Sequence, residues 1–250
     1  MKAGLSINKL VKRYGGNVVT NEVSLDFPAH SLTAIIGPNG AGKTTLLNLI
    51  TGIVLPDSGS IRLGDQELAG RGPAGIVAAG VGRAFQVANL FPSFSVQETL
   101  AACVAARSGE LRRPYGSYPS KQALRCSVEI AELVGLQGVL GRPCTTLSHG
   151  NQKLLDIAIA LAREPQVLLL DEPMAGMGQN EREAVVDCIE RLWKESGMTL
   201  IFVEHDMDVV FSTAKEVVVM QMGAVIAKGP PQEIRTHPRV VEAYLGSAHE

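Results

Sequence analysis

The stretch "GPNGAGKTT", residues 37 to 45, constrains the fold of this chain more than any other feature. It fits the pattern G-x-x-x-x-G-K-S/T, and it lies between a strand-like apolar run, "LTAIIG", and a helical segment that starts at Lys43 and closes near Gly52. Its glycines let backbone N–H groups point inward at anionic oxygens, and the helix N-terminus adds a positive end. Lys43 supplies a full charge for phosphate, and Thr44 supplies a hydroxyl for magnesium. The motif predicts a nucleotide-binding loop formed by Gly37, Asn39, Gly40, Ala41, Gly42, Lys43, Thr44 and Thr45.

Strand and helix patterns alternate along the rest of the chain. Residues 7–36 are strand-like, and residues 95–161 are alanine-rich and helical except for a polar loop at 107–120. Strand patterns return in "VLLLDEP", "TLIFVEHD" and "EVVVMQMGAVIAKG", with a helical pattern at 180–196 after the first of them. The last strand pattern has Gly223 between two apolar runs, which indicates an antiparallel hairpin at a sheet edge. The chain is therefore predicted to be an α/β protein with a mainly parallel sheet covered on both faces.

Composition excludes several classes of protein. A net charge of −2 with 19% charged residues gives no basic excess, so we expect no nucleic-acid partner. The N-terminus lacks a signal-peptide pattern, and no apolar run approaches the roughly 20 residues that span a bilayer. We therefore expect a chain that is soluble when isolated and resides in a reducing cytosol. Neither a disulfide framework nor a zinc site is indicated by the spacing of the cysteines, which are Cys103, Cys126, Cys144 and Cys188.

Carboxylates and a histidine follow two of the predicted buried strands. Asp171 ends "VLLLD", where a rigid strand end suits a magnesium-binding carboxylate, bound directly or through water. Glu172 comes where the chain leaves the sheet, so it is assigned as the general base that activates the attacking water. His205 closes "TLIFVEHD" at the carboxyl edge of the sheet, where ligands bind in this fold class, and is assigned a hydrogen bond to the γ-phosphate.

These residues resemble the ATP-binding-cassette ATPases over nearly the whole chain. Besides "GPNGAGKTT", "VLLLDEP" and His205, Gln86 in "GRAFQVANLF" resembles the Q-loop glutamine, and "LSHGNQK" resembles the signature sequence. Tyr14 resembles the aromatic residue that stacks on adenine; a surface tyrosine is the alternative. The resemblance implies ATP and Mg²⁺ as cofactors, ATP hydrolysis as the reaction, and Gln86 as a residue that senses both magnesium and the attacking water.

In this family two cassettes meet head to tail, so the signature of one subunit caps the ATP that is held by the other. The resemblance therefore implies that Ser148, Gly150 and Asn151 contact the nucleotide of a partner subunit, with the following helix directing its dipole at the γ-phosphate. His149 and Asn151 depart from the commonest signature, "LSGGQ". Gly178 stands where the family usually has aspartate or asparagine in the D-loop, the segment after "VLLLDEP". The contact that the D-loop of this family makes across the dimer therefore lacks its usual side chain here.

Further details are similar to the ATP-binding subunits of branched-chain amino-acid importers: "GRAFQVANLFPSFSVQETL", the polar loop, "AGMG" and the ending "RTHPRVVEAYLG". Lipopolysaccharide-export cassettes are the runner-up, and urea or aromatic-acid importers stay open. The resemblance implies a peripheral subunit at the cytoplasmic face of the inner or plasma membrane. Its partners would be a second cassette, identical or a sister, transmembrane permease subunits and, indirectly, a solute-binding protein.

The resemblance also implies a division into subdomains. Residues 1–85 and 165–250 would form the P-loop NTPase core with an antiparallel β subdomain, and residues 86–164 an inserted helical subdomain with the signature. Cassettes that act on DNA or ribosomes usually carry coiled-coil insertions or tandem cassettes, and a monomeric GTPase or kinase leaves "LSHGN" unexplained. An interface with a transmembrane partner and burial in the core are equally open for Phe85, Phe91 and Phe94.

Overall fold

A computed structural model describes residues 4–84, 93–109 and 119–245. Its centre is a six-stranded sheet in the order β10-β9-β3-β8-β7-β6, in which β9, β3, β8, β7 and β6 run parallel. Among these six strands only β10 is antiparallel, and it forms the edge hairpin with β9 that the sequence predicts. The strands are β3 (Leu32–Ile36), β6 (Val81–Ala84), β7 (Val167–Asp171), β8 (Thr199–Val203), β9 (Glu216–Gln221) and β10 (Ala224–Gly229).

A second, antiparallel sheet lies beside the first, in the order β2-β1-β4-β5. The alternation that is visible in "EVSLDF" places every second side chain of this part of β2, from Val23 to Phe27, in the interior, as expected for a strand with one solvated face. Helix α1 (Lys43–Ile50) begins directly after the glycine-rich loop, and its leucines share one hydrophobic cluster with strands of both sheets. The strands of this sheet are β1 (Leu5–Tyr14), β2 (Asn17–Phe27), β4 (Ser58–Leu63) and β5 (Gln66–Glu67).

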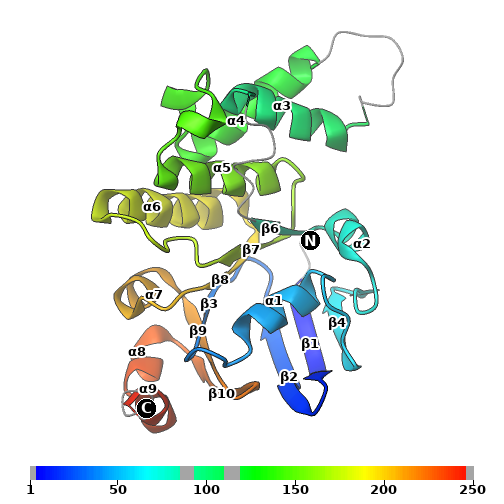
Figure 1. Cartoon of the computed structure of the whole chain (residues 1–250), viewed down its shortest axis with the longest axis vertical. Coiled ribbons are helices and arrows are strands. Elements are labelled where there is room, and N and C mark those ends of the chain that lie inside the picture. The colour runs from blue at the N-terminus through cyan, green and yellow to red at the C-terminus, as the bar shows by residue number, and fades with distance from the viewer. Residues whose placement is uncertain (1–3, 85–92, 110–118, 246–250) are drawn as a thin grey trace.

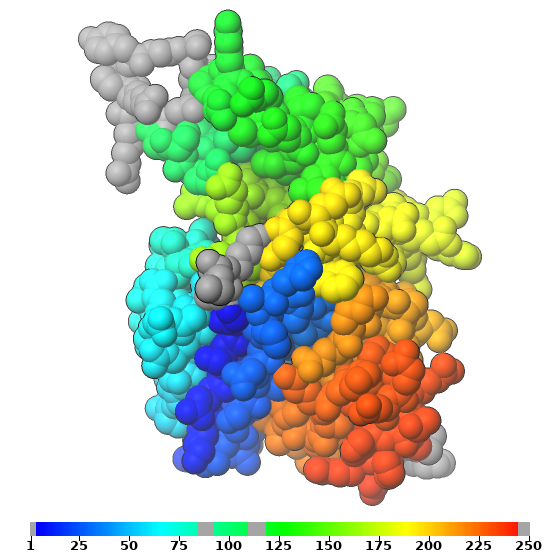
Figure 2. Space-filling view, turned by 180° about the vertical axis from the view of Figure 1, so that it is seen from behind, coloured from blue at the N-terminus to red at the C-terminus, as the bar shows by residue number. Residues whose placement is uncertain are grey.

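Three helices gather at one end of the molecule, away from the antiparallel sheet (Figure 1). They are α3 (Val96–Arg107), α4 (Lys121–Val134) and α5 (His149–Leu161), with short 3₁₀ turns at Gln137–Val139 and Cys144–Thr146. Figure 2 shows this end, in green, projecting from the rest of the molecule. Side chains of α3 and α4 nevertheless belong to the same hydrophobic cluster as those of β7 and β8. The division at residues 86 and 164 stays a prediction.

The remaining helices cover the central sheet or follow its strands. The predicted helix at 180–196 is α6 (Gln179–Ser196), which packs its buried face into the cluster shared with β7 and β8. Neither α2 nor β6 was predicted from the sequence, because α2 is only 7 residues long and the segment around it is rich in glycine. No helix among the described residues is long and apolar enough to cross a membrane. The other helices are α2 (Pro73–Ala79), α7 (Met207–Thr213), α8 (Pro231–Arg235) and α9 (Pro238–Leu245).

Candidate functional site

The glycine-rich loop connects β3 to α1, and its backbone requires glycine at several positions. Gly42, the N-cap of α1, has φ 98° and ψ 5°, and a Cβ there would lie 2.6 Å from the carbonyl oxygen of Val19. The Lys43 ammonium lies inside the loop, where it donates to the carbonyl oxygens of Gly37 at 2.6 Å and Pro38 at 3.1 Å. Burial lowers the pKa of Lys43, while the nearby carboxylates of Glu172 and Asp171 oppose that shift. The backbone carbonyl groups of the loop therefore hold the positive charge of Lys43 inside it.

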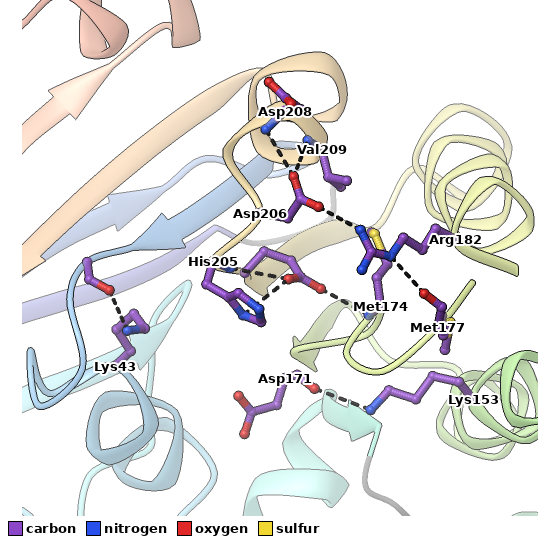
Figure 3. A network of polar contacts seen from close by, with 12 residues as sticks. Lys43, Lys153, Asp171, Met174, Met177, Arg182, His205, Asp206, Asp208 and Val209 are labelled. Carbon is purple, nitrogen blue, oxygen red and sulfur yellow. Dashed lines mark hydrogen bonds and ion pairs between the residues drawn. The ribbon is translucent and has the colours of Figure 1, made fainter. Parts of the chain in front are cut away.

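Three strand ends bring the predicted residues together. Because β3, β8 and β7 are parallel neighbours, the glycine-rich loop, His205 and the pair Asp171-Glu172 all follow carboxyl ends at one edge of the sheet. Glu172 has φ 43°, a left-handed conformation that is uncommon for a residue with a side chain, and its N–H donates to Val203 at 3.0 Å. The chain thus turns away from the sheet at Glu172, as expected from the sequence. Figure 3 shows Lys43, Asp171 and His205 around this edge.

An open cleft of about 540 Å³ is lined by Thr44, Asp171 and Glu172, and also by Arg83 and Lys153. It therefore unites the hydroxyl and the carboxylate that the sequence assigns to magnesium. One hydroxyl and one carboxylate suit Mg²⁺, which binds few protein ligands and completes its shell with water and phosphate oxygens.

Arg83 and Lys153 were missed by sequence reasoning. Arg83 donates to Asp171 Oδ2 at 2.6 Å and to Asn48 Oδ1 at 2.7 Å, so it orients the carboxylate at the end of β7. Lys153 is 7% exposed and donates to the carbonyl oxygen of Asp171 at 3.3 Å (Figure 3). Both residues carry a signal that could have revealed them: each is a charged residue within an otherwise apolar strand or helix face.

Glu204 was also missed by sequence reasoning; it connects the segment at His205 to the segment after β7. Its carboxylate is 1% exposed and accepts the N–H groups of Met174 at 2.9 Å and His205 at 3.2 Å. Burial raises the pKa of Glu204, opposed by these two hydrogen bonds. The imidazole of His205 is exposed, with Nδ1 at 3.8 Å from Glu204 Oε2. Glu204 therefore fixes the backbone of His205, while the ring of His205 stays exposed.

The signature residues form the N-terminal turn of α5. The helix starts at His149, with Ser148 as its N-cap. Ser148 Oγ accepts the N–H of Asn151 at 3.3 Å, and His149 Nε2 lies 3.2 Å from the carbonyl oxygen of Ala175. His149 thus contacts the loop after β7. Ser148, His149, Gly150 and Asn151 do not line the cleft beside Thr44 and Asp171, whereas Lys153, the last residue of "LSHGNQK", does.

The remaining predicted residues lie apart or outside the described part of the chain. Tyr14 ends β1 with 49% of its surface exposed, and the neighbouring strand approaches the nucleotide-binding loop at Val19. Phe94 is 38% exposed. Gln86 and the two rings Phe85 and Phe91 lie outside the described residues.

Comparison with known proteins identifies the family. Residues 20–175 match the ABC transporter family, and residues 224–250 match the branched-chain amino acid ATP-binding cassette transporter family. The high-affinity branched-chain amino acid transport ATP-binding protein LivG of Escherichia coli K12 is 36% identical over 98% of this chain and 98% of its own. BraF of Pseudomonas aeruginosa, with the same description, is 35% identical over the same shares. An ABC-transporter cassette solved in its ADP conformation has a TM-score of 0.86 and 27% identity, covering 98% of this chain and 99% of that one. The resemblance read from the motifs is confirmed: the chain belongs to the ATP-binding cassettes of ABC transporters.

Proposed function

We propose that this chain is the ATP-hydrolysing subunit that powers a membrane importer of branched-chain amino acids. The full-length relatives LivG and BraF carry that activity in their names, and the C-terminal residues 224–250 match the family specific to such cassettes. Lipopolysaccharide export and the import of urea or aromatic acids are not favoured. The observation that carries the ATPase assignment is the meeting of Lys43, Asp171-Glu172 and His205 at one edge of a parallel sheet.

Each residue at this edge has a chemical role in the proposal. The loop from Gly37 to Thr45 cradles the phosphates with its N–H groups, and Lys43 neutralises charge at the β- and γ-phosphates. Glu172 accepts a proton from the attacking water, and His205 donates a hydrogen bond to the γ-phosphate. Thr44 and Asp171, together with Gln86, would hold Mg²⁺, which supplies charge neutralisation on the phosphates when bound. Tyr14 offers its exposed ring to adenine.

The signature completes the site of a second cassette. Ser148, Gly150 and Asn151 lie at the start of α5 and outside the cleft of their own chain, which supports action on the ATP of a partner. ATP would contact these residues only in the closed dimer, so its binding shifts the population toward closure. Hydrolysis removes the contacts and lets the dimer open.

The partners follow from the same assignment. The second cassette would be an identical chain or a sister subunit, and the transmembrane permease would receive the movement through the segment around Gln86. A solute-binding protein would deliver the amino acid to the permease. The subunit would thus work as a peripheral protein at the cytoplasmic face of the membrane.

The dependence of ATPase rate on protein concentration tests this mechanism. A site completed by two chains predicts a specific activity that rises with concentration and then saturates as dimers fill. A specific activity that is unchanged by dilution, in a sample shown by sedimentation to be monomeric, would contradict it. Purifying the intact membrane complex and identifying its bound solute tests the cargo: a solute other than a branched-chain amino acid overturns that part of the proposal alone.

A further inference from the structure

The start of α5 binds a carboxylate from its own chain. The N–H of Gly150 donates to Glu181 Oε1 at 3.0 Å, and the hydroxyl of Ser148 contributes to lowering the pKa of the same carboxylate. Gly150 is one of the residues that the proposed function assigns to the ATP of a partner. One anionic group of the chain therefore lies where another anionic group is expected to bind.

The contact is too close for both groups to share it. A Cβ built on Gly150 would lie 2.9 Å from Glu181 Cβ and 3.1 Å from Glu181 Cδ, so the glutamate side chain extends directly across the glycine. A single N–H points in one direction and makes one well-aligned hydrogen bond. Two negative groups at this N–H would also repel each other. A phosphate oxygen can take this donor only after Glu181 has moved away.

The local sequence explains why Glu181 lies here. Helix α6 begins at the N-cap Gly178, which has no side chain to cap the helix. Glu181 is the third residue of α6, which is the position that glutamate takes in a capping box. The N–H of Gly150 and then the hydroxyl of Ser148 are the largest causes that lower the pKa of Glu181, so the side chain stays ionised at neutral pH. One carboxylate thus joins the starts of α6 and α5.

We propose that Glu181 is an internal occupant of the signature motif that the partner's ATP must displace, so that Glu181 sets the ATP concentration at which the dimer closes. This inference rests on the function proposed above. The signature can bind phosphate only in the fraction of chains in which Glu181 has moved away. Its apparent affinity for the partner's ATP is therefore the intrinsic affinity multiplied by that fraction. Glu181 is partly exposed, so its release into water is possible without unfolding either helix.

The test compares variants in a Glu172→Gln chain, which is expected to bind ATP without turning it over. Glu181→Gln removes the charge and keeps the shape, and glutamine, like glutamate, suits the third position of a helix. Glu183→Gln is the matched control, because it makes the same charge change on α6 two residues further on, where Glu183 contacts Gln179. The measurements are the ATP concentration for half-maximal dimerisation, by sedimentation, and the affinity of the isolated monomer for a fluorescent ATP analogue.

We expect Glu181→Gln to lower the ATP concentration for half-maximal dimerisation about fivefold, as fits the loss of an exposed charge-assisted contact. Glu181→Ala should act in the same direction. Glu183→Gln should leave the midpoint unchanged, and monomer affinity should be equal in all chains. An unchanged or raised midpoint in both Glu181 variants, with a parent that dimerises, overturns the role of Glu181 alone. A parent that stays monomeric at saturating ATP overturns the two-chain mechanism itself.

Discussion

Two glycines of the nucleotide-binding loop, Gly40 and Gly42, have similar left-handed backbone conformations but different surroundings, so the stability cost of alanine at each can be predicted. Gly40 has φ 78°, and no atom of the described residues lies within 4 Å of the position that a Cβ would take there. A Cβ on Gly42, at φ 98°, would instead lie 2.6 Å from the Val19 carbonyl oxygen and 3.5 Å from Gly223 Cα. A left-handed backbone costs a residue with a side chain about 1–2 kcal/mol. The clash at Gly42 involves rigid backbone of β2, so it adds about 2 kcal/mol, as overpacking commonly does.

We therefore expect Gly42→Ala to lower the free energy of unfolding by about 3 kcal/mol and the Tm by about 9 °C. Gly40→Ala, the matched control, should cost only about 1 kcal/mol and about 3 °C. Urea and thermal unfolding of the nucleotide-free chain, followed by circular dichroism, measure both quantities. Equal losses in the two variants, or a smaller loss for Gly42→Ala, would refute the argument that the Val19 carbonyl makes glycine necessary at this position.

Three further substitutions test individual roles at the sheet edge. Lys43→Ala should raise the Kd for ATP about 30-fold, as expected for the loss of a charge-assisted contact, with isothermal titration as the assay; a Kd within twofold of wild type contradicts the role of Lys43. Glu172→Gln should keep ATP affinity and lower kcat by at least about 100-fold, and hydrolysis at the wild-type rate would show that Glu172 is not the general base. Burial raises the pKa of Glu204 in the folded chain above its ordinary value of 4.5. Protonated Glu204 therefore contributes to the free energy of unfolding in full below pH 4.5, and this contribution is lost as the pH rises through the raised pKa. Urea titrations across this range should therefore show wild type losing stability relative to Glu204→Gln as pH rises, and a constant difference would contradict the assigned environment.

Much of the fold and site could be predicted from local sequence. The glycine-rich loop, the strand ending at Asp171 and the strand ending before His205 are contiguous patterns with a fixed relation to secondary structure. Parallel strands then place their carboxyl ends at one edge, so the approximate site follows without knowledge of side-chain packing. The edge hairpin around Gly223 was predictable because it too is a contiguous pattern, with a glycine between two apolar runs.

Contacts between distant segments could not be predicted in this way. Only the folded chain shows that the Glu204 carboxylate accepts the N–H of His205 and that Arg83 donates to Asp171. Glu181 reaches Gly150 across 31 positions of the chain, from a helix whose face toward α5 is set by packing. His149 shows the same limit, because it contacts Ala175 on a loop that no sequence pattern brings near it.

Mixing two inactive variants tests most directly the claim that each ATP site is completed by another chain. Lys43→Ala disables the nucleotide-binding loop and keeps the signature, whereas Ser148→Arg keeps the loop and disables the signature. Half of the dimers in an equal mixture contain both variants, and each of these has one intact composite site, so the mixture should regain about a quarter of the wild-type specific activity. If the mixture forms dimers yet stays as inactive as each variant alone, the signature does not act on the partner's ATP.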